Sequence, residues 1–252
     1  MELAIVGYGR MGREVAEIAA ERGHEVRCTV DSHAGADFDA VRPAIERGAI
    51  EPATTVIEFA LADGIKERVE AYAQVACSVV IGTTGWDEQR DEVLSAASAA
   101  GLSLVWGANF SVGANLFART TSFAARLAER VGGYDAGIVE LHHRGKKDSP
   151  SGTALMLAEG VLAELSGKDT RQIETLHRQI TEEELHIVSG RFGSIPGTHT
   201  LHLDSSADTL ELTHRARTRQ GFALGAVLAG EWVRETGGVH TVQEFFDHLF
   251  AT

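Results

Sequence analysis

The chain has 252 residues, of which 44% are hydrophobic and 23% are charged, with 36 acidic residues against 23 basic ones. This composition is that of a globular protein and excludes disordered and fibrous classes. The formal net charge of −13 argues against a nucleic-acid partner, because binding to phosphates needs clustered Lys and Arg. A cationic cluster in so acidic a chain is therefore a candidate anion site.

The sequence predicts a cytoplasmic protein with no membrane partner. The first residues, MELAIVGYGRMG, do not show the basic segment and long apolar core of a signal peptide. Charged residues interrupt every apolar run before it reaches the roughly 18–20 residues needed to cross a bilayer. Cys28 and Cys77 lie in apolar, strand-like stretches, where we expect buried free thiols rather than a disulfide.

Over the first hundred residues, short β-rich runs alternate with amphipathic stretches. The apolar runs predict strands at residues 2–6, 25–30, 56–59, 78–82 and 102–106. Between them we expect helices at Arg10–Glu21, Ala62–Gln74 and Asp87–Ala99. This alternation predicts an α/β fold with a Rossmann-type, doubly wound parallel sheet, in which ligands bind beyond the carboxyl ends of the strands.

The pattern changes near Val112. One long helix is expected to end near Val131, followed by a strand over 134–143, a helix over 154–165 and several β-like runs, which together predict a smaller α+β domain. The sequence after Gly221 is helix-forming and, by itself, leaves open which domain it joins. We expect a first domain over residues 1–108, completed by the helices of 221–252, and a second domain over 109–220.

A glycine-rich run directly follows the first strand and opens the first helix. Its spacing, GYGRMG, is that of a dinucleotide fingerprint. The first glycine permits a tight turn, the second lets the backbone approach a pyrophosphate, and the third allows the helix to pack closely on the strand. We therefore expect the whole run to bind the cofactor: Gly7, Tyr8, Gly9, Arg10, Met11 and Gly12.

The second strand ends at Asp31, 19 residues after Gly12. A carboxylate at this distance is expected to accept hydrogen bonds from the ribose 2′-OH of the adenosine, whereas the alternative is an ordinary turn aspartate. Ser32 and His33 follow Asp31, so no arginine stands beside it to receive a 2′-phosphate. We therefore expect NADH to be favoured, with NADPH as the alternative cofactor.

Two further strand ends carry small residues. Each is expected to let the backbone approach the nicotinamide half of the cofactor, although each can equally be a simple strand-to-helix turn. These candidate cofactor residues are Gly82, Thr83 and Thr84 after the fourth strand, and Gly107, Ala108, Asn109 and Phe110 after the fifth.

The stretch VELHHRGKKDSPSGTALMLAE gathers basic and titratable residues in this acidic chain. A helix begins directly after them, and its first amides and hydroxyls are suited to hold a carboxylate. The alternative is a helix cap beside a solvated cationic loop. No metal is expected, because adjacent histidines on a strand point to opposite faces and we find no third ligand at metal spacing.

The run VELHHRGKKDSPSGTA resembles the signature of the 4-hydroxy-tetrahydrodipicolinate reductase (dihydrodipicolinate reductase) family, E-x-H-H-x-x-K-x-D-x-P-S-G-T-A, at every fixed position. The resemblance extends over essentially the whole chain, including GTTG at 82–85, GANFSVGANL at 107–116 and GRFGSIPGTHTLHL at 190–203. It implies an oxidoreductase of lysine and diaminopimelate biosynthesis that uses NADH or NADPH to reduce a cyclic imine dicarboxylate.

The resemblance also implies roles for individual residues. His142 would be a catalytic acid or base, and Lys146 the proton donor. The implied ligands of the dicarboxylate are His143, Lys146, Ser151, Gly152 and Thr153. The first domain would then bind the dinucleotide, and the second domain would bind the substrate and form a homotetramer through its sheet.

Two segments depart from the family pattern: the stretch between Asp31 and Val56 is short, and the end of the following strand is altered. The usual strand end, an acid followed by Phe, a hydroxyl residue and a proline, appears here as Glu58-Phe59-Ala60-Leu61-Ala62. Two other functions remain open: another imine or amino-acid dehydrogenase of similar fold, and a non-catalytic dinucleotide sensor. The substrate motif favours the reductase over both, because a fold alone does not determine a function.

Overall fold

The computed structural model describes residues 1–33 and 35–251. It divides into two compact units, Met1–Val112 with Arg219–Thr252, and Gly113–Thr218. The chain thus leaves the first unit after Val112 and returns to it at Arg219. We refer to them as the first unit and the second unit.

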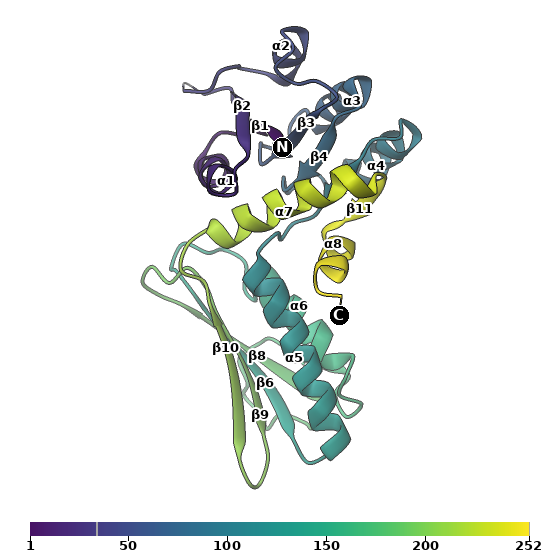
Figure 1. Cartoon of the computed structure of the whole chain (residues 1–252). Helices are drawn as coiled ribbons and strands as arrows, with labels where there is room; N and C mark the ends of the chain where they lie inside the picture. The colour runs from purple at the N-terminus through teal and green to yellow at the C-terminus, as the bar shows by residue number, and fades with distance from the viewer. Residues whose placement is uncertain (34, 252) are drawn as a thin grey trace. The chain divides into compact units, whose positions relative to one another are not determined.

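The first unit is built around a six-stranded parallel sheet (Figure 1). Its strands are β1 (Glu2–Val6), β2 (Glu25–Val30), β3 (Thr54–Glu58), β4 (Ser78–Ile81), β5 (Leu104–Trp106) and β11 (Val239–Thr241), in the order β11-β5-β4-β3-β1-β2. Because β2 and β3 flank β1 on opposite sides, the strand order reverses at β1. In open α/β sheets this reversal is the place where ligands bind.

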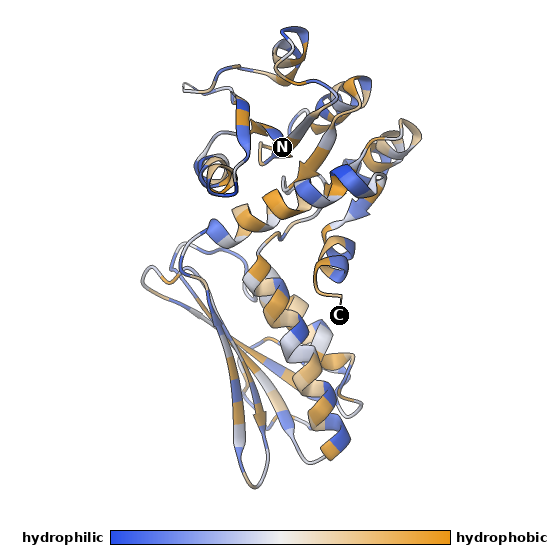
Figure 2. Ribbon diagram, in the orientation of Figure 1, coloured by the Kyte–Doolittle hydropathy of each residue, from blue (hydrophilic) through white to orange (hydrophobic). Residues whose placement is uncertain are grey.

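Helices cover both faces of this sheet. They are α1 (Arg10–Glu21), α2 (Val41–Glu46), α3 (Ile65–Val75), the 3-10 turn η1 (Asp87–Gln89), α4 (Arg90–Ala99), α7 (Gln220–Thr236) and α8 (Val242–Leu249). One hydrophobic cluster packs around α3 and α4, and another around α1 and α7. Helix α7 buries small and branched residues such as Ala223, Ala226 and Val233, and Figure 2 shows hydrophobic and hydrophilic residues alternating along it.

Several elements differ from the sequence expectations for local reasons. Helix α3 begins at Ile65 rather than near Ala62, because Gly64 adopts a left-handed conformation and forms its N-cap. The helix expected from Asp87 starts with the 3-10 turn η1. Helix α2 and strand β11 were not predicted, since six and three residues are too short to show a periodic pattern.

The second unit is a mixed five-stranded sheet with helices on one face. Its elements are α5 (Val112–Val131), β6 (Asp135–His142), α6 (Gly152–Leu162), β7 (Thr170–Gln172), β8 (Glu184–Arg191), β9 (Thr198–Asp204) and β10 (Thr209–Arg215), with the sheet order β10-β9-β6-β8-β7. Strands β6, β8 and β7 run parallel, and β9 and β10 pair antiparallel. Buried residues from α5, α6 and the sheet form one hydrophobic cluster between them.

The fold therefore agrees with the expected class: a Rossmann-type parallel sheet and a smaller α+β unit. In β6, alternate residues are buried, ending with Glu140 and His142 on the same side as Ile138. This is the period of two that a strand imposes on its side chains. It places two ionisable residues at the helix-covered face, at the end of an otherwise apolar row.

Candidate active site

The carboxyl edge of the parallel sheet gathers the sequence-predicted cofactor residues. Gly7 follows β1, Asp31 follows β2, Gly82 follows β4 and Gly107 follows β5. Because parallel strands end at the same edge, these positions lie along one side of the first unit. Helix α1 begins at Arg10, so its free amides and positive dipole end lie at this edge, where they favour an anion.

The three glycines of the fingerprint meet different surroundings. Gly7 has a φ of +88°, and an added Cβ would lie 2.5 Å from the backbone after β3. At Gly12, a Cβ would lie 2.4 Å from the carbonyl oxygen of Gly7. At Gly9, a Cβ would meet no protein atom within 4 Å. The fold thus requires glycine at positions 7 and 12, while the open side of Gly9 fits the close approach of a pyrophosphate.

Asp31 lies beside the glycine-rich loop. Its Oδ1 accepts hydrogen bonds from the backbone N–H of His33 at 3.0 Å and contacts the His33 imidazole at the same distance. Burial would raise the pKa of Asp31, but these bonds and one from the backbone of Tyr8 hold it below its ordinary value. The group is therefore an ionised acceptor, as recognition of a ribose hydroxyl requires.

A cation that was not identified from the sequence stacks on Tyr8, whose backbone donates to Asp31. The Arg13 guanidinium stacks 4.9 Å from the centre of the Tyr8 ring, and its Nη2 would lie 4.0 Å from a Cβ at Gly35. Its positive charge therefore lies at the glycine-rich loop.

The glycines at the ends of β4 and β5 lie against other side chains of the protein. A Cβ at Gly82 would lie 2.1 Å from the Phe59 ring, and one at Gly107 would lie 2.2 Å from Val242. The missing side chains at these positions are therefore explained by packing within the protein. Thr83 is buried and its Oγ1 donates to the carbonyl of Ala60 at 3.1 Å, whereas Thr84 is exposed.

At the end of β5, side chains again pack within the protein, and the backbone is left to contact a ligand. The Phe110 ring is buried and meets Phe59 edge-on, so only its backbone can serve a ligand. Asn109 Oδ1 accepts a hydrogen bond from the backbone N–H of Ser111 at 3.0 Å, which fixes the turn, and Ala108 is exposed. Backbone groups thus dominate this edge.

The altered strand end at residues 58–62 begins with a buried acid. Glu58 is fully buried and accepts hydrogen bonds from Arg68 at 2.8 and 3.0 Å and from the Tyr72 hydroxyl at 2.6 Å. Burial and the Glu58 carboxylate raise the pKa of Tyr72 well above its ordinary value, so Tyr72 stays a donor. This network holds the strand end in place without the proline of the family pattern.

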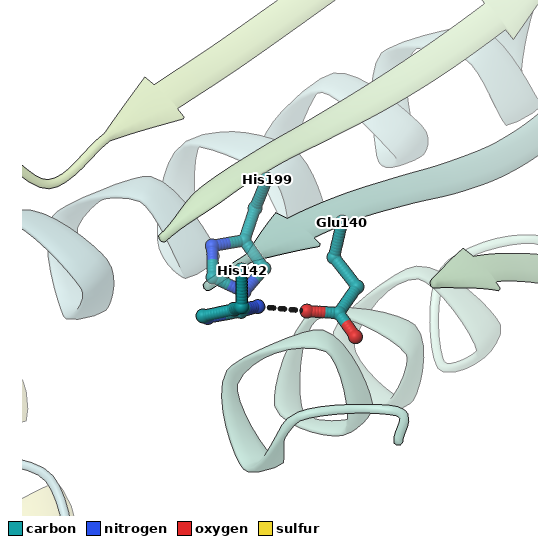
Figure 3. Close-up of side chains that lie close together, drawn as sticks. All are labelled: Glu140, His142 and His199. Atoms are coloured by element: carbon teal, nitrogen blue, oxygen red, sulfur yellow. Dashed lines mark ion pairs between the residues drawn. The ribbon is translucent and has the colours of Figure 1, made fainter. Parts of the chain in front are cut away.

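In the second unit, strand register brings together residues that are far apart in the sequence. Glu140 on β6 lies directly opposite His199 on β9, and His142 is paired with Arg191 on β8. Figure 3 shows Glu140, His142 and His199 side by side, with an ion pair between the carboxylate and the His142 ring. All three side chains are buried.

Glu140 is the centre of this cluster. Its Oε2 forms the ion pair with His142 Nδ1, and its Oε1 accepts hydrogen bonds from Arg191 Nη2 at 2.6 Å and from the backbone N–H of Ser151 at 3.2 Å. Burial alone would raise the pKa of Glu140, but the bond from Arg191 and the adjacent charges lower it below its ordinary value. The carboxylate is therefore ionised at neutral pH.

The two buried histidines are neutral at pH 7. Burial lowers the pKa of His142, and the charges of Lys146 and Arg191 act in the same direction, while Glu140 opposes them. Burial and the neighbouring His142 lower the pKa of His199 to about 4. Two imidazoles whose rings lie 5.1 Å apart would repel each other if both were charged.

His199 also prepares the hydroxyl of Ser151. Its Nε2 lies 3.1 Å from Ser151 Oγ, and its buried Nδ1 has no partner among the described residues. A buried N–H without an acceptor is rarer than a bare nitrogen, so the single proton of His199 belongs on Nε2. Ser151 Oγ then accepts from His199 and from the N–H of Ala154, and its own hydrogen is left to donate.

The cationic residues after β6 form the loop that leads to α6. His143 is exposed, consistent with its position next to the buried His142. Lys146 Nζ lies 2.9 Å from Asp148 Oδ1 and its side chain is 24% exposed, whereas Lys147 is exposed. Ser151 is the N-cap of α6, so Gly152 and Thr153 are its first two residues, and their amides belong to the helix end that favours anions.

Glu140, His142 and His199 also offer donor atoms that lie within 4.8 Å of one another. A carboxylate and two imidazoles are a donor set that zinc accepts. However, Arg191 already binds the carboxylate, and the positive charge of Lys146 acts on His142. These charges favour a proton-transfer network over a cation site. Sequence spacing did not show His199 as a third donor, because only the pairing of β9 with β6 brings it to the cluster.

Sequence reasoning missed three residues of this cluster. Glu140 carried a usable signal, because it precedes His142 by two residues in a strand and so shares its face. Arg191 and His199 lie in the family-like run at 190–203, but no local spacing connects them with His142, since only the pairing of β8 and β9 with β6 brings them to the site.

Comparisons with known proteins cover both units. The family model described as "Dihydrodipicolinate reductase, N-terminus" matches residues 1–110, and "Dihydrodipicolinate reductase, C-terminus" matches residues 113–246. No helix among the described residues has the length and apolarity to cross a membrane.

Relatives that match over their full length are named 4-hydroxy-tetrahydrodipicolinate reductase. The 4-hydroxy-tetrahydrodipicolinate reductase of Christiangramia forsetii is 33% identical, covering 99% of this chain and 99% of its own. That of Archaeoglobus fulgidus is 35% identical, covering 98% and 100%. A solved structure, the dipicolinate-bound dihydrodipicolinate reductase from Paenisporosarcina sp. TG-14, shares the fold with a TM-score of 0.76 at 22% identity, covering 97% of this chain and 98% of its own. The chain therefore belongs to the dihydrodipicolinate reductase family.

Proposed function

We propose that this chain reduces 4-hydroxy-tetrahydrodipicolinate to tetrahydrodipicolinate, with loss of water and consumption of NADH or NADPH, in lysine and diaminopimelate biosynthesis. The full-length similarity to reductases of that name supports the activity. The observation that carries the proposal is the polar cluster at the end of β6, where the residues of the family signature adjoin the start of α6.

A dinucleotide fits the first unit. The open side of Gly9, the amides at the start of α1 and the ionised Asp31 match the pyrophosphate and ribose of such a cofactor. When bound, the reduced nicotinamide supplies a hydride to the electron-poor imine ring. Thr84, Ala108 and the backbone of Asn109 and Phe110 are proposed to line the nicotinamide half.

The second unit supplies the groups that hold a dicarboxylate. The amides of Gly152 and Thr153, the Ser151 and Thr153 hydroxyls, His143 and Lys146 are the proposed ligands of its two carboxylates. Lys146 is the proposed proton donor to the electron-rich ring that remains after hydride addition, and His142 is the proposed acid or base. A dinucleotide sensor would have no use for the buried Glu140–His142 pair beside this anion-binding helix end.

The activity is tested in a coupled assay. The substrate is generated freshly, and consumption of NADH and of NADPH is followed separately. Turnover that depends on 4-hydroxy-tetrahydrodipicolinate supports the proposal. Cofactor consumption with other imines or with amino acids, but none with this substrate, would overturn it in favour of another dehydrogenase.

NADH is the proposed favoured cofactor. Asp31 accepts a hydrogen bond from a 2′-OH and repels a 2′-phosphate. We expect only a small difference in kcat/KM between NADH and NADPH, because His33 beside Asp31 and Arg13 on Tyr8 can attract the phosphate. We expect a higher kcat/KM for NADH than for NADPH. We expect Asp31→Asn to reduce the ratio of the NADH value to the NADPH value. A clear preference of the unaltered protein for NADPH would contradict this prediction.

A homotetramer is proposed to form through the sheet of the second unit. The face opposite α5 and α6 carries Val139, Leu141 and Val188, and Val188 is 44% exposed. Analytical ultracentrifugation checks this proposal, and four chain masses is the expected result. A monomer at micromolar concentration would contradict it.

A further inference from the structure

We propose that Glu140 is a positioning residue for His142, which it holds with a proton on Nδ1, so that Nε2 is the nitrogen that exchanges a proton during the reaction. Arg191 contributes to this positioning, because it donates a hydrogen bond to the Glu140 carboxylate and holds it in place. The inference rests on the proposed function for its catalytic meaning, but the state of the His142 ring can be measured without any substrate.

The geometry points to Nδ1 as the protonated nitrogen. Glu140 Oε2 lies in direct contact with His142 Nδ1 within the buried cluster, and an ionised carboxylate only accepts hydrogen bonds. A neutral imidazole carries one proton, and placing it on Nδ1 turns an N–H towards the carboxylate oxygen. Neither atom has a hydrogen-bond partner elsewhere among the described residues. With the proton on Nε2, a bare nitrogen would face a buried carboxylate, which is repulsive.

The carboxylate itself cannot turn away. Its Oε1 is held by Arg191 at 2.6 Å and by the N–H of Ser151 at 3.2 Å. Arg191 also donates to the carbonyl oxygens of Gly190 at 2.8 Å and of Asp148 at 2.7 Å. Glu140 thus links β6 to the end of β8 and to Ser151, the N-cap of α6, so the His142 ring is oriented relative to the proposed substrate ligands.

Gly197 lies beside His142 Nε2 and, having no side chain, does not cover it. A Cβ at Gly197 would lie 3.0 Å from His142 Nε2, closer than carbon and nitrogen normally approach. The bare backbone of Gly197 therefore leaves this side of Nε2 open. His199 packs edge-on against the same ring and is neutral, so it does not compete for the His142 proton.

Four charged or titratable groups face His142: Glu140 on its own strand, Arg191 on β8, Lys146 on the following loop and His199 on β9. Lys146 and Arg191 disfavour a positive ring, His199 is neutral, and Glu140 alone among the four favours the positive ring. When Nε2 gains a proton the ring becomes cationic, and Glu140 stabilises that charge through Nδ1–H. When Nε2 gives the proton up, the ring returns to the neutral form with its proton on Nδ1.

The first experiment reads the proton directly. Nitrogen NMR of the uniformly ¹⁵N-labelled full chain distinguishes the two neutral forms of each histidine, and the His142 signals are identified by their loss in His142→Gln. We expect Nδ1–H in the unaltered protein. In Glu140→Gln, the amide can accept from Nδ1 or donate to it, so we expect a mixture and a His142 pKa that moves to lower pH. A neutral His142 protonated on Nε2 in the unaltered protein would overturn the proposal.

The second experiment connects this state to turnover. Glu140→Gln should lower kcat at least about tenfold while KM changes little, because a positioned acid or base contributes roughly 10²–10⁴-fold. The limb of the kcat–pH profile that reports His142 should move to lower pH. Glu140→Asp, which keeps the charge, should retain more of kcat than Glu140→Gln does. Equal losses in both variants, with an unmoved profile, would show a merely structural role.

The controls separate misfolding and a wrong function from a wrong inference. Glu164→Gln removes a carboxylate that pairs with Arg126 at 2.6 Å on the surface of the same unit, and it should leave kcat unchanged. If Glu140→Gln does not fold, Gly197→Ala tests the same nitrogen, since its methyl would crowd Nε2 and should lower kcat while the Nδ1–H signal persists. Full activity of Gly197→Ala would count against the proposal. A protein without reductase activity but with Nδ1–H on His142 would refute the proposed function alone.

Discussion

In the first unit the candidate cofactor site is made mainly of backbone: the turn at Gly7, the open side of Gly9 and the amides at the start of α1. In the second unit the candidate substrate site is made of side chains, which three strands and a helix end bring into one buried cluster. The two sites therefore depend on different properties of the chain.

The difference affects how each site tolerates change. A backbone site depends on the absence of side chains, so an added methyl is the informative substitution. A side-chain cluster depends on the charge of each member, because a buried carboxylate or guanidinium that loses its partner is left uncompensated. The following predictions test this contrast, from the largest expected effect to the smallest.

The first prediction concerns Lys146 and its neighbour Lys147. If Lys146 delivers the proton, Lys146→Ala should lower kcat by roughly 10²–10⁴-fold. Lys147→Ala should do far less, because Lys147 is exposed whereas Lys146 pairs with Asp148 at 2.9 Å. Measurements of kcat and of the NADH dissociation constant in both variants check this.

NADH affinity should survive both lysine substitutions if the two units divide the work as proposed. Equal losses of kcat in the two variants would show that Lys146 is not the proton donor. A loss confined to NADH binding would instead break the contrast between a backbone cofactor site and a side-chain substrate site.

The second prediction concerns stability in acid. The pKa of His199 falls from an ordinary 6.5 to about 4 on folding, so below pH 6.5 the unfolded chain binds the extra proton first. The stability contributed by neutral His199 is therefore complete above pH 6.5 and is lost as the pH falls towards 4. The loss should reach roughly 3 kcal/mol.

Urea unfolding at a series of pH values measures this effect. His199→Gln removes the titrating group, so the variant should lose less stability than the unaltered protein over the same pH range. Parallel pH dependences of the two proteins would show that His199 does not titrate in this way.

The third prediction concerns Thr153, the second residue of α6. Thr153→Val removes a hydroxyl but leaves the amides of the helix end, so it should raise KM with little change in kcat. A hydrogen bond to a charged group contributes on the order of 1.5–3 kcal/mol, equivalent to roughly 10–150-fold. An unchanged KM in a folded variant would remove Thr153 from the proposed ligands.

The fourth prediction contrasts two glycines of one motif. Gly9→Ala meets no protein atom within 4 Å, so it should leave the melting temperature nearly unchanged while its methyl crowds a bound pyrophosphate. A steric conflict of this kind costs about 1–3 kcal/mol and should weaken NADH binding accordingly. Calorimetric titration with NADH measures the change.

Gly12→Ala is the matched comparison. Its methyl would lie 2.4 Å from the Gly7 carbonyl oxygen, so this variant should lose stability as well as NADH affinity. If Gly9→Ala bound NADH normally, the open side of Gly9 would not be the place where the cofactor approaches.

The sequence alone was sufficient for the features that depend on local spacing. Alternating strands and helices predicted the parallel sheet, and helix α1 has the bounds expected from its pattern. The glycine spacing before α1 and the cap at Ser151 were visible for the same reason, since each depends on residues a few positions apart. The resemblance to a reductase family used such local motifs and was confirmed by the family models and the full-length relatives.

Only the tertiary structure decided what surrounds His142. Arg191 and His199 reach it because β8 and β9 flank β6 in a particular register, and register depends on the packing of the whole sheet. The structure also separated glycines that the sequence could not rank: Gly82 and Gly107 serve packing, whereas the side of Gly9 is open. A motif records which residues are present, but burial and the positions of neighbouring charges determine their protonation, and these arise only when distant segments pack together.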